Sequence, residues 1–307
     1  MTITVLATPH GGDGASRRRA AWLMLLPLLF GLTIFAVYPS AYVLALSFTK
    51  STLGQPFRTW IGWANYRWLT VGGDEIFAAS LVRAVAFSLG VALVELCLGL
   101  WLALSLASLR RGGRLVRSIM LLPLMTPPVL VGVAWKLLLA PGGGLINGKL
   151  LAWGLIDAPV SFLGTRPWAM LSIMVADIWQ WTPFVAILAY AALRQVPEDV
   201  IEAALLDGAS ERVIFWRILL PLTAPMLLAI FVLRLIMAFK TFDLLYILTF
   251  GGPGDATDMA GFTIWRTALR DFDVGTAAAE TVLFAVVVSI VIMPFLWLHR
   301  RVEEKAL

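Results

Sequence analysis

The sequence predicts an all-α, polytopic membrane protein that crosses the bilayer about six times. Of its 307 residues, 60% are hydrophobic and only 14% are charged, whereas soluble domains are about half apolar and about a quarter charged. The apolar residues also gather in stretches long enough for membrane helices, which need about 20 residues each. The six stretches are Trp22–Phe48, Ile76–Leu109, Ser118–Leu139, Trp168–Leu193, Ile218–Phe239 and Ala277–His299.

Lysine and arginine are distributed unequally between the two sides of the membrane. Thirteen fall on the side that holds both termini and seven on the other, and the richer side is expected to be cytoplasmic. Both termini are therefore predicted to be cytoplasmic, in agreement with an even number of spans. The first group is Arg17, Arg18, Arg19, Arg110, Arg111, Arg114, Arg117, Arg194, Arg212, Arg217, Arg300, Arg301 and Lys305, and the second is Lys50, Arg58, Arg67, Lys149, Arg166, Arg266 and Arg270.

The chain is predicted to be a single membrane domain, residues 21–307, after a disordered cytoplasmic tail, residues 1–20. Basic residues precede the first apolar stretch, as in a secretory signal. That stretch continues past Pro39 to Phe48, which is too long for a signal core, so we expect an uncleaved first helix. The short apolar piece Leu244–Phe250 is expected to be a continuation or a separate turn rather than a seventh span.

No cofactor or metal site is expected. The chain has one cysteine, Cys97, inside an apolar run, and its two histidines, His10 and His299, lie at opposite ends. The segment Gly143–Lys149 spells the start of a phosphate-binding loop, but Leu150 follows where serine or threonine would hold Mg²⁺, and no strand precedes it. The chain is therefore predicted not to be an enzyme.

The segment 195–217 interrupts two apolar stretches with an amphipathic, charged sequence that predicts two short helices joined by a hinge. Pro197 suits a first helical position, and Glu198 follows in the first turn, where acids favour the positive end of the helix dipole. Gly208 suits the left-handed residue that ends a helix. Ser210 can cap the next helix, which runs toward Pro221.

This layout resembles the EAA loop of the permease subunits of bacterial binding-protein-dependent ABC importers. Glu202-Ala203-Ala204, Gly208 and Ile218–Pro221 match that pattern. In that family the loop is cytoplasmic and docks on an ATPase subunit. The resemblance implies that ATP hydrolysis belongs to separate chains and assigns coupling to Glu202, Ala203, Ala204, Asp207, Gly208, Ala209 and Phe215.

Other segments extend the resemblance from about Trp22 to the C-terminus. Trp60–Tyr66 is similar to the family's segment after the first helix, and Pro123, Pro127 and Pro128 to its proline-kinked third helix. Phe242–Pro253 resembles the FD…GGP segment of the maltose and glycerol-phosphate permease branch. The resemblance implies a type I importer permease fold in the bacterial inner membrane. It also implies a sister permease that forms a heterodimer, two ATPase subunits and an external solute-binding protein as partners.

The resemblance further points to two helix faces as solute contacts. Polar or aromatic residues recur at helical spacing on the helices that flank the loop, and an aromatic ring beside hydrogen-bonding groups suits a sugar. These candidate residues are Asp177, Trp181, Phe184, Arg234, Met237, Ala238 and Thr241. The alternatives are that Asp177 and Arg234 pair with each other, and that Lys240 and Asp243 form an interfacial pair.

The predicted function is ATP-driven import of a sugar or sugar-like solute, with oligosaccharides, polyols and anionic sugars all left open. One alternative is an ion-coupled secondary transporter, which would show intramembrane carboxylates in related halves of an internal repeat. Glu95 and Asp177 have no such matched partners. A membrane-embedded enzyme is the other alternative, and neither explains the EAA-like segment.

Overall fold

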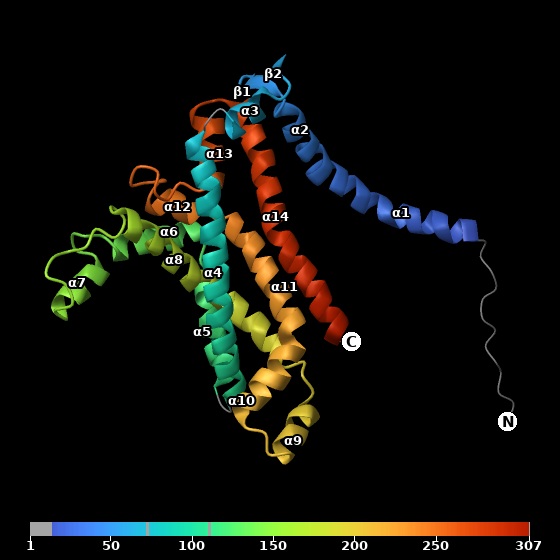
Figure 1. Ribbon diagram of the computed structural model, residues 1–307, viewed down its shortest axis with the longest axis vertical. Coiled ribbons are helices and arrows are strands. Elements are labelled where there is room, and N and C mark those ends of the chain that lie inside the picture. The colour runs from blue at the N-terminus through green and yellow to red at the C-terminus, as the bar shows by residue number, and fades with distance from the viewer. Residues whose placement is uncertain (1–13, 72–73, 110–111, 307) are drawn as a thin grey trace.

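The computed structural model describes residues 14–71, 74–109 and 112–306, which are mostly helical (Figure 1). The first apolar stretch forms α1 (Gly14–Leu32), a π-helical turn (Thr33–Val37) and α2 (Tyr38–Leu46). Residues 1–13 of the predicted tail lie outside the described residues, whereas Gly14 already begins a helix. Helix α1 leans away from the other helices, and its apolar side chains remain exposed within this chain.

A two-stranded hairpin follows α2, which the all-helical prediction did not include. It consists of β1 (Thr49–Thr52) and β2 (Gln55–Trp60), and α3 (Ala64–Thr70) comes next. The amide nitrogen of Asn65 donates to the carbonyl oxygens of Ser47 at 2.9 Å and Thr49 at 3.1 Å. The Tyr66 hydroxyl lies 2.7 Å from that of Ser47. The Trp60–Tyr66 segment thus ties the hairpin to the end of α2.

Four long helices make up the bundle, namely α4 (Glu75–Ser108), α8 (Arg166–Leu193), α11 (Leu220–Phe239) and α14 (Val274–Ala306). Helix α4 packs along α8, and α11 contacts α4, α8 and α14. The α4–α8 contact depends on small residues. A Cβ atom at Gly99 would lie 2.6 Å from Val185 Cγ1 and 3.0 Å from the backbone nitrogen of Ala186, so the two helices approach more closely than larger side chains permit.

The third predicted span, Ser118–Leu139, is sharply bent at the prolines that predicted a kink. It is divided into α5 (Gly113–Met125) and α6 (Pro128–Leu138), which are bent by 91° at Thr126–Pro127. Residues that precede a proline avoid the helical region, and Thr126 and Pro127 both do so, with ψ values of 126° and 138°. The short helix α7 (Leu145–Ala152) lies beyond α6.

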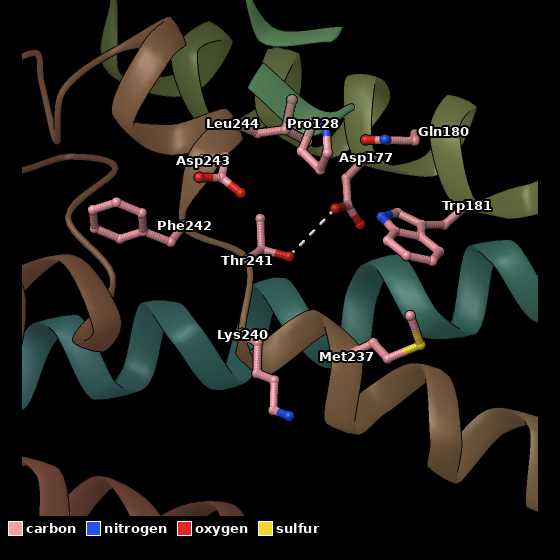
Figure 2. A pocket seen from close by; sticks show the side chains of 10 residues that line it. All are labelled: Pro128, Asp177, Gln180, Trp181, Met237, Lys240, Thr241, Phe242, Asp243 and Leu244. Atoms are coloured by element: carbon pink, nitrogen blue, oxygen red, sulfur yellow. Dashed lines mark hydrogen bonds between the residues drawn. The ribbon is translucent and has the colours of Figure 1, made fainter. Parts of the chain in front are cut away.

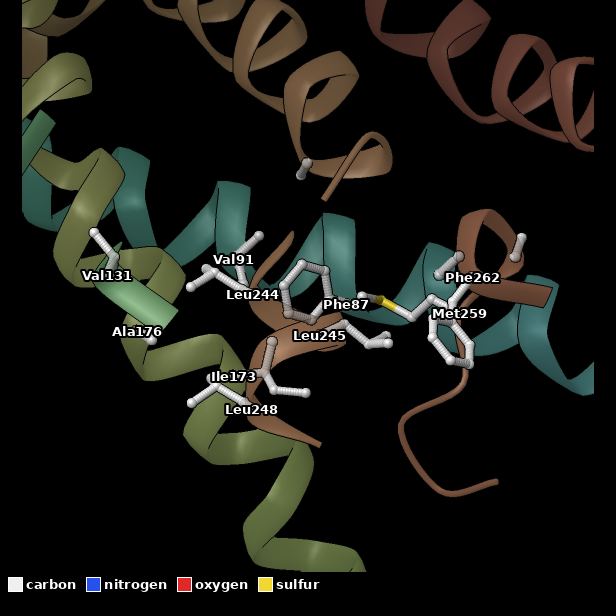
Figure 3. Close-up of a cluster of buried hydrophobic side chains, with 13 residues drawn as sticks. Phe87, Val91, Val131, Ile173, Ala176, Leu244, Leu245, Leu248, Met259 and Phe262 are labelled. Carbon is white, nitrogen blue, oxygen red and sulfur yellow. The ribbon is translucent and has the colours of Figure 1, made fainter. Parts of the chain in front are cut away.

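The segment after α11 folds into short helices at the end of the bundle that carries the hairpin. Helix α12 (Asp243–Leu248) is separate, as predicted for the Leu244–Phe250 piece, and α13 (Ala260–Trp265) continues into a π-helical turn (Arg266–Arg270). Figure 3 shows that side chains of α12 pack against α4 and α8. This core cluster consists of Ala84, Phe87, Val91, Val131, Ile173, Ala176, Ala238, Leu244, Leu245, Leu248, Met259, Ala260 and Phe262.

The charged segment 195–217 forms two helices at the opposite end of the bundle (Figure 1). Helix α9 (Glu198–Leu206) has Pro197 as its N-terminal cap rather than as its first helical residue. Helix α10 (Glu211–Ile214) continues through a π-helical turn (Phe215–Leu219) into α11. The fifth span therefore begins at Glu211, earlier than the predicted start at Ile218, and runs unbroken for 29 residues.

The distribution of basic residues generates a prediction of topology. Cysteine at Ser210 is expected to react with a membrane-impermeant maleimide only from the cytoplasmic side, and cysteine at Leu155 only from the outside. Both positions are exposed within this chain, and Cys97 is first replaced by serine because it is also exposed. Labelling of intact and permeabilised cells measures the sidedness, and the reverse pattern would contradict the orientation.

Candidate functional site

The two helix faces singled out in the sequence meet around a buried arginine. Arg234 of α11 is fully buried, and Asp177 of α8 and Glu95 of α4 are buried with it. Its Nε lies 2.5 Å from Glu95 Oε2, and its Nη2 donates to Glu95 Oε1 at 2.9 Å and to Asp177 Oδ2. The guanidinium carbon also lies 5.3 Å from the centre of the Trp181 ring. The alternative in which Asp177 and Arg234 pair is therefore confirmed as a contact.

Glu95 completes this ion cluster, and its pairing with Arg234 was not predicted from the sequence. A lone acid in an apolar run requires a partner, but the sequence does not specify which basic residue comes within reach. Two carboxylates face one guanidinium here, so Arg234 is neutralised on two sides. Because Arg234 is also fully buried, its charge is not exposed to a solute.

A cavity of about 300 Å³ adjoins the ion cluster (Figure 2). Four of the predicted residues line it, and Thr241 donates a hydrogen bond of 3.3 Å to Asp177 Oδ1. Thr241 lies in the turn after α11 rather than on the helix. The full lining is Pro128, Asp177, Gln180, Trp181, Met237, Lys240, Thr241, Phe242, Asp243 and Leu244.

The remaining predicted residues lie away from this lining. Phe184 packs in the α8–α11 core and meets the Trp181 ring edge-on at 6.1 Å. Ala238 belongs to the core cluster of Figure 3.

The predicted alternative of an ion pair between Lys240 and Asp243 is not observed. Within the described part of the chain, these two residues form no ion pair, and Figure 2 shows the Lys240 side chain directed away from Asp243.

Two interruptions of helical structure border the cavity. One is the α5–α6 bend, from which Pro128 reaches the lining, and the other is the turn between α11 and α12. Irregular backbone at membrane depth is tolerated where protein buries it or where it borders a cavity. Lys136 Nζ of α6 donates to the carbonyl oxygen of Ile247 in α12 at 2.9 Å. The two interrupted segments are therefore connected to each other.

The FD…GGP segment supports the cavity wall through aromatic packing. The Phe242 ring stacks on that of Tyr246 at 5.5 Å and on that of Phe262 at 6.2 Å. Gly251 has a φ of +86°, and a Cβ there would lie 2.9 Å from the Phe262 ring. This glycine is therefore required both by its backbone conformation and by the space available.

A second polar cluster secures α13 to α4. Asp258 is fully buried, its Oδ1 accepts from Thr263 at 2.8 Å, and its Oδ2 lies 2.7 Å from Arg266 Nη1. Arg83 Nε of α4 donates to the Asp258 carbonyl oxygen at 2.7 Å. Burial raises the pKa of the Asp258 carboxyl above its ordinary value, although the Thr263 hydrogen bond and the Arg266 charge act in the opposite direction. The role of this cluster is therefore structural, since it holds α13 against α4.

The predicted hinge of the charged segment has the geometry of a helix C-cap. Gly208 has a φ of +76°. The N–H of Ala209 donates to the Ala204 carbonyl at 2.9 Å and that of Gly208 to the Leu205 carbonyl at 3.0 Å, which is the Schellman pattern. Ser210 occupies the N-cap position of α10, but its side chain makes no capping hydrogen bond.

Helix α9 presents both charge and apolar surface outward. Glu202, Ala203 and Asp207 are exposed, and Leu205 and Leu206 are exposed by 54% and 90%. Phe215 is partly buried at the start of the π-helical turn that leads into α11. A helix that exposes leucines within its own chain suits contact with another molecule.

The segment that resembles a phosphate-binding loop has a different structure. Most of Gly143–Lys149 lies in helix α7, with Leu145 as its first residue. Asn147 is buried, and its side chain bonds both the N–H and the carbonyl of Val160. The asparagine therefore closes the α7–α8 connection instead of facing a nucleotide.

Comparison with known proteins places these features in context. The family model described as "Binding-protein-dependent transport system inner membrane component" matches residues 95–306. The trehalose/maltose transport system permease protein MalF of Thermococcus litoralis is 35% identical over 90% of this chain and 92% of its own length. The sn-glycerol-3-phosphate transport system permease protein UgpA of Yersinia pestis is 30% identical over 92% of this chain and 95% of its own.

Solved structures share the fold at lower sequence identity. A chain of a bacterial ABC transporter involved in the import of the acidic polysaccharide alginate has a TM-score of 0.80. It is 24% identical to this chain, and the match covers 93% of this chain and 96% of that one. A chain of the MetNI methionine ABC transporter has a TM-score of 0.55 over 75% of this chain and 97% of its own, at 18% identity.

The ion cluster generates a stability prediction. Replacing Arg234 by methionine leaves two carboxylates without their cation, and loss of one partner from a buried ion pair costs about 3–5 kcal/mol. We expect Arg234→Met to lower the melting temperature and the folded yield of the detergent-purified protein. The triple variant with Glu95→Gln and Asp177→Asn is expected to recover most of both. Equal stability of the single variant and the wild type would contradict a structural role for the cluster.

Proposed function

Because this chain belongs to the family of binding-protein-dependent transport system inner membrane components, and is thus a permease subunit of an ABC importer, we propose that it carries a neutral sugar or sugar-like solute past Asp177 and Trp181. The observation that carries this proposal is the neutralisation of Arg234 by Glu95 and Asp177. Among the described residues that line the cavity, Lys240 is the one cation, and Asp177 and Asp243 are acids. An anionic solute would therefore meet no excess of positive charge.

The chemistry of the lining suits a polyhydroxylated solute. Trp181 and Phe242 offer aromatic faces, and Gln180, Thr241 and Asp243 offer hydrogen-bonding groups. Sugars present apolar C–H faces and hydroxyl edges, which such a mixed lining can match. One relative is named for the transport of trehalose and maltose, and another for that of sn-glycerol 3-phosphate. Because the lining has no excess of positive charge, the cavity favours a neutral sugar over an anionic solute.

We further propose that this chain works with a sister permease, two ATPase subunits and an external solute-binding protein. Helix α1 leans away from the other helices of this chain, which supports a partner within the membrane. The exposed leucines of α9 support a partner at the opposite end from the hairpin. Family membership supports the identity of these partners, and one structural relative is a transporter solved with a pentasaccharide-bound periplasmic protein.

The unbroken helix from Glu211 to Phe239 gives the proposed coupling a physical route. It begins just after the Gly208 cap and carries both Arg234 and the cavity residue Met237. Closure of the ATPase dimer would move α9, and the continuous helix would transmit that displacement to the cavity. Such rigid-body movement of packed helices is an established means of switching.

The solute proposal is tested by two substitutions within the same cavity. The complete complex in proteoliposomes is assayed for uptake of maltose, trehalose and glycerol 3-phosphate. Trp181→Ala should raise the KM for the neutral sugar by roughly two- to tenfold, because an aromatic contact contributes about 0.5–1.5 kcal/mol. Lys240→Met should change it by less than about twofold. The control is Trp168→Ala, an exposed tryptophan on the same helix.

Selective uptake of glycerol 3-phosphate, abolished by Lys240→Met, would contradict the neutral class. It would instead show that the lysine supplies a counter-charge for an anion.

The coupling proposal is tested by charge reversal at Glu202. The side chain is exposed, so Glu202→Lys should leave insertion and folding intact while it disrupts docking of the ATPase. We expect solute uptake and solute-stimulated ATP hydrolysis to fall at least tenfold, with unchanged amounts of protein in the membrane. Glu304→Lys, an exposed acid near the C-terminus, is the matched control. Normal uptake by the Glu202 variant would exclude this docking mode.

A further inference from the structure

Gln180 of α8 is buried beside the cavity with only half of its amide group engaged. The side chain is 2% exposed, and its Nε2 donates to the carbonyl oxygen of Thr126 at 3.0 Å. Because that carbonyl can only accept, the amide nitrogen must face it. The amide oxygen, Oε1, then faces away and has no hydrogen-bond partner in the described part of the chain.

The nitrogen of Gln180 supplies a donor that the α5–α6 bend has lost. In an uninterrupted helix the Thr126 carbonyl would accept from the N–H of residue 130. That N–H donates instead to the Pro127 carbonyl at 2.9 Å. The bend thus leaves a partly buried backbone acceptor, and the Gln180 amide satisfies it.

The oxygen of Gln180 is a covered acceptor beside the cavity and lacks a donor within the described part of the chain. Gln180 follows Asp177 by three residues and precedes Trp181, so all three share one face of α8. Figure 2 shows its amide extending toward Pro128 on the side of the cavity where Asp177 and Trp181 lie. Buried polar atoms are seldom left without a partner. A sugar hydroxyl is a donor of the kind that this oxygen requires.

We propose that Gln180 is a solute-binding residue that also links the cavity to the α5–α6 bend. Its Oε1 accepts a hydrogen bond from a hydroxyl of the solute, while its Nε2 holds the Thr126 carbonyl. Solute that orders the amide therefore also orders the bend. Because Lys136 connects α6 to Ile247 of α12, the bend and the Lys240–Leu244 wall of the cavity respond together. This inference rests on the proposed passage of a neutral sugar.

Two substitutions separate the functions of the amide. Gln180→Met has a similar volume and neither donates nor accepts, so it removes both contacts. Gln180→Glu keeps an acceptor but, when ionised, cannot donate to the Thr126 carbonyl. Gln55→Met, at an exposed position of β2, is the matched control. Should Gln180→Met fail to assemble, Gln180→Glu still tests the link to the bend.

The first measurement is uptake of maltose and trehalose by the complete complex in proteoliposomes. Gln180→Met is expected to raise the KM for the transported sugar about tenfold, as loss of one buried hydrogen bond requires. The Gln180→Glu variant is expected to retain more of the affinity. The Gln55→Met control should match the wild type.

The second measurement reports the bend directly. Nitroxide labels on cysteines at Leu115 of α5 and Leu137 of α6, both exposed, are placed in the Cys97→Ser background. Double electron–electron resonance measures the distance between the two labels. In the wild-type complex the distribution of this distance should narrow with saturating maltose. Both Gln180 variants should show a broader distribution without sugar, and for Gln180→Met the addition of maltose should not narrow it.

The outcomes distinguish this inference from the proposed function. A wild-type complex that transports neither sugar would overturn the proposed function and, with it, the solute contact of Gln180. A wild-type complex that transports sugar, with an unchanged KM for Gln180→Met, would overturn the inference alone and show that the oxygen meets only water. A raised KM with wild-type distance distributions would also overturn it, because the cavity and the bend would then be independent.

Discussion

The arrangement of this protein depends on the buried ion cluster of Glu95, Asp177 and Arg234. The three residues lie far apart in the sequence and on three different helices, and each side chain is withdrawn from water. A lone charge at membrane depth is unfavourable, so each member of the cluster requires the others. The cluster therefore fixes the relative positions of α4, α8 and α11, and α14 packs on α11 and in turn contacts α2 and β1.

Close packing of α4 and α8 makes this cluster possible. Gly99 lies four residues after Glu95 and Ala103 four residues after that, so the three share one helix face. Gly99 meets Val185 and Ala186 of α8 at distances that admit no side chain. Small residues thus bring the helices together at one level, and the carboxylates of Glu95 and Asp177 reach a common guanidinium at the next. Without that approach, the ion pairs of 2.5–2.9 Å could not form.

Rigid and interrupted helices have different positions in this fold. The continuous helix from Glu211 to Phe239 connects the α9 end of the molecule with the ion cluster. In contrast, the α5–α6 bend and the turn between α11 and α12 meet at the cavity, where backbone groups that leave helical pairing find other partners. The Thr126 carbonyl is paired by Gln180 and the Ile247 carbonyl by Lys136. The route to the cavity is thus one continuous helix, whereas the cavity itself is bordered by interrupted backbone.

Much of the architecture could be predicted from local sequence. Apolar stretches located the spans because hydropathy is a property of consecutive residues, and the positive φ of Gly208 followed from the short-range signals of a helix end. The motifs around Glu202 and Phe242 identified the permease family. The prolines at 127 and 128 indicated a kink, but its angle of 91° depends on how α6 packs against α12.

The site itself was predictable only in part. Helical spacing grouped Asp177 with Trp181 on one face and Arg234 with Met237 on another, but it could not show that Arg234 lies behind the cavity with its charge neutralised. The pairing of Glu95 with Arg234 and the role of Gln180 were missed because the partners lie 139 and 54 residues away. A sequence determines which groups must be paired in a membrane, since desolvation penalises each of them alone. Only the tertiary structure decided which groups pair with one another, because that depends on distances between helices that local sequence does not encode.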